Sequence, residues 1–229
     1  MAGKKSRSQI ETELKIKLSP DDLEKVLKKL RKEAVSGSFY HKYMPRYYYD
    51  TEALDLHQRG ASLRVQYVSG KRGALGAYEQ TFKYGLEDSG DEVLTRKEVK
   101  DEVESPLPDL TAIQDADAVK ISSGIENKSL KHIFTAAIER RLFYIEKGKN
   151  TELEIAFDVG IISLSDDISK FIKINEIEIE VKKGSAKSIQ EIREMIFDIA
   201  PSAEIQRQSK SEQGTIFYSK NKNINLNKP

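Results

Sequence analysis

Residues 10–18 read IETELKIKL, and a charged side chain occupies every second position from Glu11 onward. Glu11, Glu13 and Lys15 alternate with residues such as Leu14 and Ile16. Successive side chains of a β-strand point to opposite faces, so this spacing predicts a strand with one charged face and one apolar face. The fold then depends on which of these two faces the rest of the chain covers.

The same period of two recurs along the chain. Further strands are expected at residues 38–50, 61–68, 76–84, 92–103, 137–146, 151–162 and 171–182. Short turns separate most of them, which indicates antiparallel neighbours. With residues 10–18 they make about eight strands, and eight antiparallel strands close naturally into a barrel that can hold one small ligand.

Two segments show the period of an amphipathic helix. Their apolar stripes are Leu23, Val26, Leu27 and Leu30 in the first segment, and Ile189, Ile192, Ile196 and Ile199 in the second. Residues 105–130 suit short helices, and a polar segment carrying Lys210 follows the second stripe. Amphipathic helices need an apolar surface to cover, and the apolar strand faces supply one. The predicted fold is therefore α+β: an eight-stranded, largely antiparallel closed β-barrel with helices packed outside.

Helices on the outside would direct the charged strand faces into the lumen. The alternative is an ordinary barrel with an apolar interior and solvated charges. The charges are also sorted by sign among the strands, which solvated faces do not require; Glu176, Glu178 and Glu180, for example, share one face. Enclosed charges need compensating ions. This pattern favours divalent cations held by the carboxylates and a polyanion held by Lys and Arg.

Composition narrows the class of protein and of metal. The chain has 229 residues, with 38 Lys plus Arg against 37 Asp plus Glu, and so lacks the basic excess typical of nucleic-acid binders. It has no Cys and only three His, which excludes thiolate metal sites and disfavours a His-based zinc site. Carboxylates would have to hold any metal, which favours Mg²⁺ or Mn²⁺.

The chain shows no apolar run of membrane-spanning length and no secretory signal. We therefore expect a soluble cytoplasmic protein, a monomer or homodimer, that binds neither nucleic acid nor membrane. No long linker interrupts the pattern, so we expect a disordered arm at residues 1–8, a single domain at residues 9–220 and a disordered tail at residues 221–229.

The motifs, taken in order, resemble the CYTH superfamily, also called triphosphate tunnel metalloenzymes. Residues 11–15, ETELK, match its N-terminal Glu-x-Glu-x-Lys signature, which is weak alone. Residues 47–66 resemble its Tyr-Asp-Thr segment leading to Leu-Arg. Further matches are EQTFK (79–83), TRKEV (95–99), RRLFY (140–144), ELEIAFDVG (152–160), NEIEIEVKKG (175–184) and SKSEQG (209–214). The resemblance covers nearly the whole chain.

The resemblance implies a role for each matching residue. The triphosphate would be bound by Lys15, Arg64, Lys83, Arg96, Arg141 and Lys210. The catalytic group would be Glu11, Glu13 and Lys15, with the two carboxylates holding one metal ion. A second metal ion would be held by Asp158, Glu176 and Glu178. Supporting lumen residues would be Glu98, Glu154 and Glu180.

Three residues depart from the family pattern: Gln66 and Gln213 stand where Arg is frequent, and Lys100 where Glu is common. The segments are most similar to bacterial inorganic triphosphatases, so the expected reaction is metal-dependent hydrolysis of tripolyphosphate to pyrophosphate and phosphate. One alternative is a class IV adenylate cyclase or a nucleoside or thiamine triphosphatase. Another is a non-catalytic protein that binds polyphosphate or nucleotide, which the three departures keep open.

Overall fold

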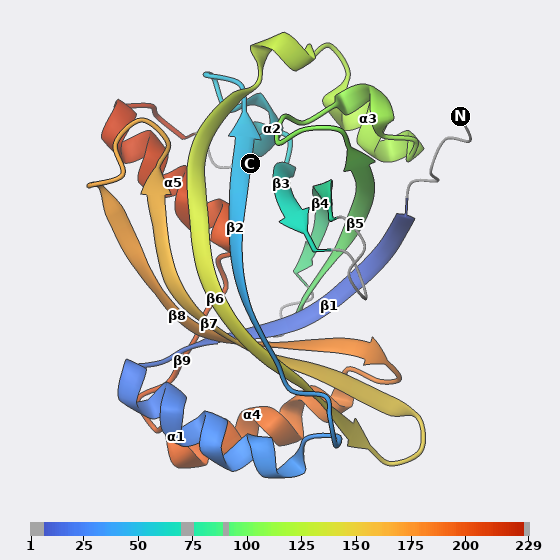
Figure 1. The fold of residues 1–229 in the computed structure, drawn as a ribbon, viewed down its shortest axis with the longest axis vertical. Coiled ribbons are helices and arrows are strands. Elements are labelled where there is room, and N and C mark those ends of the chain that lie inside the picture. The colour runs from blue at the N-terminus through green and yellow to red at the C-terminus, as the bar shows by residue number, and fades with distance from the viewer. Residues whose placement is uncertain (1–6, 70–75, 89–91, 227–229) are drawn as a thin grey trace.

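Eight long strands form one closed antiparallel barrel in the computed structural model, which describes residues 7–69, 76–88 and 92–226 (Figure 1). The strands are β1 (Arg7–Lys17), β2 (Tyr40–Asp50), β3 (Ser62–Val68), β4 (Ala77–Asp88), β5 (Leu94–Val103), β6 (Lys131–Lys147), β7 (Thr151–Leu164) and β8 (Phe171–Lys183). Around the barrel their order is β5-β4-β3-β2-β6-β7-β8-β1, and β1 returns to β5. The predicted fold is thus confirmed.

The first strand closes the barrel because it has two partners. β1 pairs with β5 from Arg7 to Glu13, and with β8 from Glu13 to Lys17. Glu13 is the residue at which the two pairings overlap, opposite Leu94 on one side and Glu180 on the other. A two-residue strand, β9 (Glu204–Ile205), adds to the end of β1.

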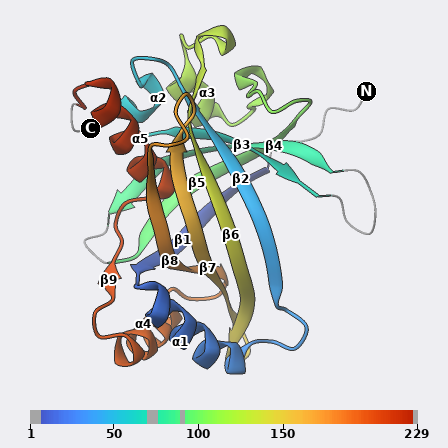
Figure 2. The same cartoon turned by 60° about the vertical axis from the view of Figure 1, so that its left-hand side comes forward.

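Two helices cover the outer face of β1, β7 and β8. These are α1 (Pro20–Leu30) and α4 (Lys187–Ile199), which lie together below the long strands in Figure 2. Their apolar stripes pack against outward side chains such as Leu14, Ile155 and Ile177, all fully buried. Since alternate residues point inward, Glu11, Glu13 and Lys15 face the lumen. The expected covering of the apolar strand faces is confirmed.

A second apolar core lies outside β3, β4 and β5. The segment between β5 and β6 covers it with α3 (Ala116–Ser122) and the short helical turns η3 (Leu110–Ala112) and η4 (Asn127–Ser129). A four-residue helix, α2 (Asp55–Gln58), precedes β3, and a single turn, η1 (Arg31–Glu33), follows α1. Ala118 of α3 and Leu63 of β3 are fully buried in this core.

The last helix, α5 (Lys210–Lys222), packs on the inner face of the barrel at one end. Tyr218 joins Tyr48 and Phe134 in a third apolar core there. Gly214 allows this close approach, because a Cβ at that position would lie 2.3 Å from the Phe134 ring. The sequence pattern predicted only a polar segment at this point, so α5 is an element that was missed.

The ends of the described chain lie close to the predicted domain limits. β1 begins at Arg7 and α5 ends at Lys222, so residues 7–8 and 221–222 belong to regular elements. The remainder of the predicted N-terminal arm, residues 1–6, and residues 227–229 of the predicted tail lie outside the described residues. Among the residues that the structure describes, no helix is long and apolar enough to cross a membrane.

Candidate functional site

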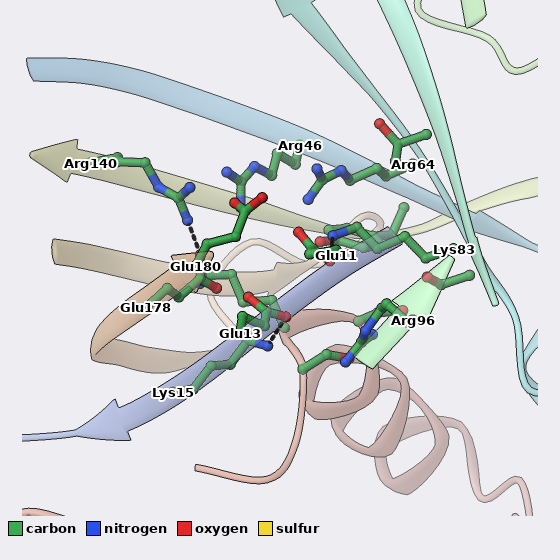
Figure 3. A pocket seen from close by; sticks show the side chains of 16 residues that line it. Glu11, Glu13, Lys15, Arg46, Arg64, Lys83, Arg96, Arg140, Glu178 and Glu180 are labelled. Atoms are coloured by element: carbon green, nitrogen blue, oxygen red, sulfur yellow. Dashed lines mark hydrogen bonds and ion pairs between the residues drawn. The ribbon is translucent and has the colours of Figure 1, made fainter. Parts of the chain in front are cut away.

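The lumen of the barrel contains a pocket lined mainly by charged side chains, here called the tunnel pocket. Its empty volume is about 530 Å³, including solvent space. The lining residues are Glu11, Glu13, Lys15, Arg46, Tyr48, Ser62, Arg64, Thr81, Lys83, Arg96, Arg140, Glu178, Glu180, Ser209, Lys210 and Ser211. Figure 3 shows the charged groups converging from opposite strands.

The charges of the tunnel pocket are separated into two neighbouring arcs of the barrel wall. The adjacent strands β5, β4, β3, β2 and β6 contribute Arg96, Lys83, Arg64, Arg46 and Arg140 in that order. We call these five side chains the basic wall. The adjacent strands β7, β8 and β1 contribute the acidic wall, which consists of Asp158, Glu176, Glu178, Glu180, Glu11 and Glu13. The positive and negative charges that the sequence pattern assigns to different strands therefore lie on different parts of the barrel wall.

Three carboxylates of the acidic wall form a compact cluster. Asp158, Glu176 and Glu178 each offer an oxygen atom, and these atoms lie within 4.8 Å of one another. The Lys210 ammonium group of α5 lies 2.6 Å from Asp158, 2.5 Å from Glu176 and 2.8 Å from Glu178. Arg140 donates to both oxygens of Asp158 at 2.6 Å. Burial raises the pKa of Glu178, but Lys210 and Arg140 outweigh it and hold that pKa well below its usual range.

A second group of ion pairs lies where β1 meets β4 and β5. Lys83 donates to Glu11 at 2.5 Å and lies 3.2 Å from Glu98. Glu98 is also 2.6 Å from Lys100 and 3.7 Å from Arg64. Burial raises the pKa of Glu98, but Lys83, Arg64 and Lys100 outweigh burial and hold the pKa well below its usual range. These carboxylates are therefore charged, and their counter-ions come from the basic wall.

Some guanidinium nitrogen atoms of the basic wall have no hydrogen-bond partner within the described part of the chain. The Nε atoms of Arg46, Arg64 and Arg96 are buried and have no hydrogen-bond partner among the described residues. Arg46 is only 4% exposed. Burial, together with the nearby guanidinium groups of Arg64 and Arg140, lowers its pKa to about 10. Buried guanidinium N–H groups without acceptors are costly to a folded protein, and they point to an anionic ligand.

Glu180 differs from the other carboxylates of the acidic wall. It lies on β8 opposite Glu13 of β1 and pairs with Lys182 at 2.8 Å. Burial, with smaller contributions from the charges of Glu11 and Glu154, raises its pKa to about 7 in spite of that partner. Glu13 and Glu180 thus lie opposite each other, and each is paired with a lysine of its own strand, Lys15 and Lys182.

The structure brings most of the predicted site residues together. Those that line the tunnel pocket are Glu11, Glu13, Lys15, Arg64, Lys83, Arg96, Glu178, Glu180 and Lys210. Asp158 and Glu176 are buried in the barrel wall, where they form ion pairs with Lys210, which lines the pocket. Glu98 is likewise buried and pairs with the pocket residue Lys83. Glu154 lies apart, where its carboxylate accepts from the Tyr144 hydroxyl at 2.9 Å.

The prediction that Arg141 lies at this site is corrected by the structure. Arg141 and Arg140 are neighbours on β6, so their side chains leave opposite faces of the barrel. Arg140 is paired with Asp158 in the strand register and points into the lumen, whereas Arg141 forms a bidentate ion pair with Glu24 of α1 on the outside. Arg140 therefore occupies the place predicted for Arg141.

Arg46 and Tyr48 also line the pocket but were not among the predicted residues, and neither were Ser209 and Ser211, which flank the predicted Lys210 at the start of α5. Arg46 and Tyr48 are two residues apart on β2 and share the lumen face, so the period of two could have identified Arg46. The Tyr48 ring stacks on Phe134, with centroids 4.6 Å apart. Burial raises the pKa of Tyr48, but Arg64, Arg46 and Lys210 outweigh burial and lower it.

The acidic wall fits a hard divalent cation in its chemistry. Its donors are all carboxylate oxygens, the ligands that Mg²⁺ and Mn²⁺ prefer. The cluster of Asp158, Glu176 and Glu178 has the mutual spacing of ligands around one ion, and it carries one more negative charge than Lys210 and Arg140 neutralise. Glu11 and Glu13, two residues apart on β1, add a further pair of oxygen donors.

A wider and more apolar hollow, here called the mouth cavity, adjoins the tunnel pocket. Ser62, Lys83, Arg96, Ser209 and Ser211 line both spaces. The remaining lining residues of the mouth cavity are His57, Arg59, Gly60, Ala61, Tyr84, Gly85, Ile121 and Glu212. The charged lumen therefore opens, at the end near the start of α5, into a space with few charges.

Solved structures with similar folds span nearly the whole chain. A Hippeastrum protein, an adenylyl cyclase candidate reported to have a dominant triphosphatase activity, superposes with a TM-score of 0.59 at 14% identity, covering 92% of this chain and 96% of its own. An adenylate cyclase candidate from Bacillus halodurans gives 0.56 at 19% identity, covering 90% and 97%. The triphosphatase of the Mimivirus capping enzyme gives 0.51 at 11% identity, covering 83% and 88%.

At these identities the solved structures show a common fold. A search of curated proteins finds no match. The family model of the CYTH domain matches residues 9–215, which includes every strand of the barrel and the start of α5. The sequence match and the charge-lined barrel agree, and the chain belongs to the CYTH domain family.

Proposed function

We propose that this protein hydrolyses inorganic triphosphate to pyrophosphate and phosphate in the tunnel pocket, with the help of a divalent metal ion. The observation that carries the proposal is the unpaired part of the basic wall. Arg46, Arg64 and Arg96 each present a buried Nε atom without an acceptor among the described residues, and the acidic wall faces them across the lumen. A linear polyanion that also binds cations satisfies both walls at once.

In this proposal the basic wall binds the phosphate chain. Arg64, Lys83 and Arg96 lie on successive strands, so they can contact successive groups of one extended ligand. Arg46 and Arg140 extend the row on β2 and β6. Guanidinium groups bind phosphate oxygens in pairs, which fixes the orientation of the chain as well as its position.

The metal ligands are assigned to the acidic wall. Glu11 and Glu13 would hold one ion, and Asp158, Glu176 and Glu178 a second. When bound, such an ion neutralises phosphate charge and favours transfer of the phosphoryl group. Lys15 is buried beside Glu13, where it limits the repulsion among the carboxylates of β1 and β8.

The reaction needs no covalent enzyme intermediate. Carboxylates at the start of β1 would orient a water molecule in line with the scissile bond. The water oxygen forms a bond to the terminal phosphorus while the bond from that phosphorus to the bridging oxygen breaks. The bridging oxygen leaves with pyrophosphate, and the water proton passes to solvent or to a carboxylate. The basic wall stabilises the charge that develops on the departing oxygen.

Relatives with named activities support this choice. The Hippeastrum protein and the Mimivirus capping enzyme domain are both described as triphosphatases. The test is a panel of tripolyphosphate, ATP and thiamine triphosphate with Mg²⁺ or Mn²⁺, in which phosphate release is measured. We expect turnover of tripolyphosphate with at least one metal. Tight binding without turnover under both metals would instead favour a non-catalytic polyphosphate-binding protein.

The mouth cavity favours a second candidate, a triphosphatase or cyclase acting on a triphosphate with an organic group. Such a group could lie against Ala61, Tyr84 and Ile121 while its phosphates reach the tunnel pocket. The same panel separates the candidates. Faster hydrolysis of ATP or thiamine triphosphate than of tripolyphosphate, or formation of cyclic AMP from ATP, would replace our first choice.

A further inference from the structure

Helix α5 begins inside the tunnel pocket. Its N-cap Ser209 and its first two residues, Lys210 and Ser211, all line the pocket. The first N–H groups of a helix lack acceptors within the helix. Here the Glu212 N–H donates to the Ser209 hydroxyl oxygen, and the Gln213 N–H to the Ser209 carbonyl. The N–H groups of Lys210 and Ser211 have no such partner in the first turn.

The ion pairs of Lys210 fix this helix end in the lumen. Its ammonium group contacts all three carboxylates of Asp158, Glu176 and Glu178, and the side chain is 3% exposed. Four residues further along the helix, Gly214 lies against the Phe134 ring. The first turn is therefore held between two fixed contacts, and its N–H groups cannot turn away from the pocket without breaking them.

An independent observation is that the pocket facing this helix end contains buried hydrogen-bond donors without acceptors in the part of the chain that the structure describes. Arg46 is 4% exposed and lines the same pocket, and its buried Nε atom has no hydrogen-bond partner among the described residues. Arg96 also has a buried Nε without a partner, and together with Lys83 it lines the passage between the tunnel pocket and the mouth cavity beside Ser209 and Ser211. The positive end of the α5 dipole adds to these cations.

We propose that the first turn of α5 is a phosphate-binding element of the tunnel. The N–H groups of Lys210 and Ser211 and the Ser211 hydroxyl would donate to the oxygens of one phosphate group, which Arg96 contacts from the opposite side. This inference rests on the proposed function, since it assigns one phosphate of the triphosphate to a place in the same pocket. Helix N-termini bind phosphate in this way because N–H direction and dipole act together.

The assignment gives α5 a second role besides filling the barrel end. A phosphate bound by its first turn would join the helix to the basic wall, while Lys210 joins it to the acidic wall. Ligand binding and docking of α5 would then stabilise each other by linkage. A helix that merely fills the end of the barrel has no such coupling.

The test uses an acidic residue at the helix start. Ser211→Asp places a carboxylate where the phosphate would bind, whereas an acidic residue in the first turn of a helix favours the helix itself. We expect at least about tenfold weaker binding of tripolyphosphate, because like charges repel strongly at close range in a desolvated site. Binding is measured by calorimetry in EDTA, which separates anion binding from turnover. The unfolding midpoint should not fall.

The chain offers a matched control in α4. Both helices have 13 residues and open with Lys-Ser-x-Gln, Lys187–Gln190 in α4 and Lys210–Gln213 in α5, so Ser188 holds the same helical position as Ser211. Because α4 packs outside the barrel, Ser188→Asp should leave tripolyphosphate binding within about twofold of the wild type, as expected for a distant exposed charge.

Each outcome decides the inference. If the wild type binds tripolyphosphate and Ser211→Asp binds it equally well, the phosphate site on α5 is refuted. If the variant fails to fold, the wild-type amide signals of Lys210 and Ser211 are followed by NMR during a tripolyphosphate titration; unmoved signals at saturation refute the site, and downfield shifts support it. Binding without hydrolysis in Mg²⁺ or Mn²⁺ would refute the proposed function and leave this site standing.

Discussion

Glu13 is the residue at which binding and catalysis can be separated. It belongs to the acidic wall and is one of the metal ligands that we propose, so Glu13→Gln would remove that ligand's charge while the basic wall stays intact. We expect turnover of tripolyphosphate to fall at least about 100-fold, as for losses of transition-state charge stabilisation, with binding in EDTA retained. Steady-state kinetics and calorimetry measure the two quantities. Full activity of the variant would show that the metal assignment to β1 is wrong.

Glu24→Gln serves as the control for this change. Glu24 is an exposed carboxylate of α1 whose partner, Arg141, also lies outside the barrel. Since neither side chain reaches the tunnel pocket, turnover should be unchanged.

We expect Arg46 to lower the stability of the ligand-free protein and to strengthen tripolyphosphate binding. Its guanidinium group is buried without an acceptor, and repulsion by Arg64 and Arg140 contributes to its lowered pKa. Arg46→Met removes that cost, so we expect the ligand-free protein to gain on the order of 1–3 kcal/mol of unfolding free energy. Tripolyphosphate binding should weaken at least about tenfold, because one charge-assisted contact is lost. Denaturant titration and calorimetry measure the two effects.

The control for Arg46 is Arg141→Met, which breaks only the exposed pair with Glu24. Exposed pairs contribute roughly 0–1 kcal/mol, so stability should change little and tripolyphosphate binding not at all. A large loss of stability in Arg46→Met would contradict the view that this side chain is kept for a ligand.

The two arginines of β6 show how far sequence can assign a site. The period of two fixes that Arg140 and Arg141 point to opposite faces, but it does not say which one points inward. The strand register decides this, since it places Arg140 beside Asp158 of β7. The carboxylates of β1 and β8 could be assigned because each lies in a long run with an unambiguous apolar face. Two adjacent arginines provide no such reference.

At the scale of elements, Gly214 decides whether α5 can dock. Alanine is the better helix former, by about 1 kcal/mol in an isolated helix. In the folded protein, however, the added methyl group would lie 2.3 Å from the Phe134 ring. We expect Gly214→Ala to destabilise the protein by about 1–3 kcal/mol through overpacking. Thermal unfolding of the ligand-free protein measures the change.

A second substitution checks the cause of this loss. Phe134→Leu shortens the side chain that the new methyl group meets, so the double variant Gly214→Ala with Phe134→Leu should be more stable than the sum of the single changes predicts. Simple additivity of the two changes would show that the Gly214 effect does not arise from contact with Phe134.

The strands were predictable from sequence and α5 was not, for a physical reason. Around the tunnel pocket the strands alternate between a charged lumen face and an apolar outer face, and α1, α4 and the β5–β6 segment cover much of that outer face. The buried residues of α5 are Lys210, Gly214, Thr215, Tyr218 and Ser219, which form no apolar stripe. The helix packs partly against charged and small groups of the lumen, so the usual apolar period is missing. Its place could be recognised only once the barrel existed.

At the scale of the whole molecule, the tunnel charges make stability sensitive to acid. Burial raises the pKa of Glu98, but Lys83, Arg64 and Lys100 outweigh it, so the folded-state pKa lies below the usual value of 4.5. The unfolded chain then binds more protons in acid. The stability that Glu98 contributes is fully present above pH 4.5 and is lost as the pH falls through the lower folded-state pKa.

The variant Glu98→Gln tests whether stability falls with decreasing pH for this reason. At pH 7 the variant should be less stable than the wild type by about 3–5 kcal/mol, the range for breaking a buried ion pair. If unfolding free energies are measured from pH 7 to pH 3, the difference should shrink steadily below pH 4.5, because there the unfolded wild-type chain binds a proton at Glu98 and the folded protein does not. A difference that does not change with pH would mean that the Glu98 charge is not the source of the loss.

Because β1 pairs with both β5 and β8, the barrel can close only after β8 has been synthesised. The ribosome releases β1 first, but its partner β8 is completed more than 160 residues later, at Lys183. Until then Lys15 has no β8 strand beside it, and the acidic wall does not exist as a unit. The nascent chain can form the β2–β5 meander early, whereas the metal and phosphate sites arise together only when the last long strand meets the first. We therefore expect a ribosome-bound chain truncated before β8 to be unable to bind the ligand, although it would already carry all five residues of the basic wall.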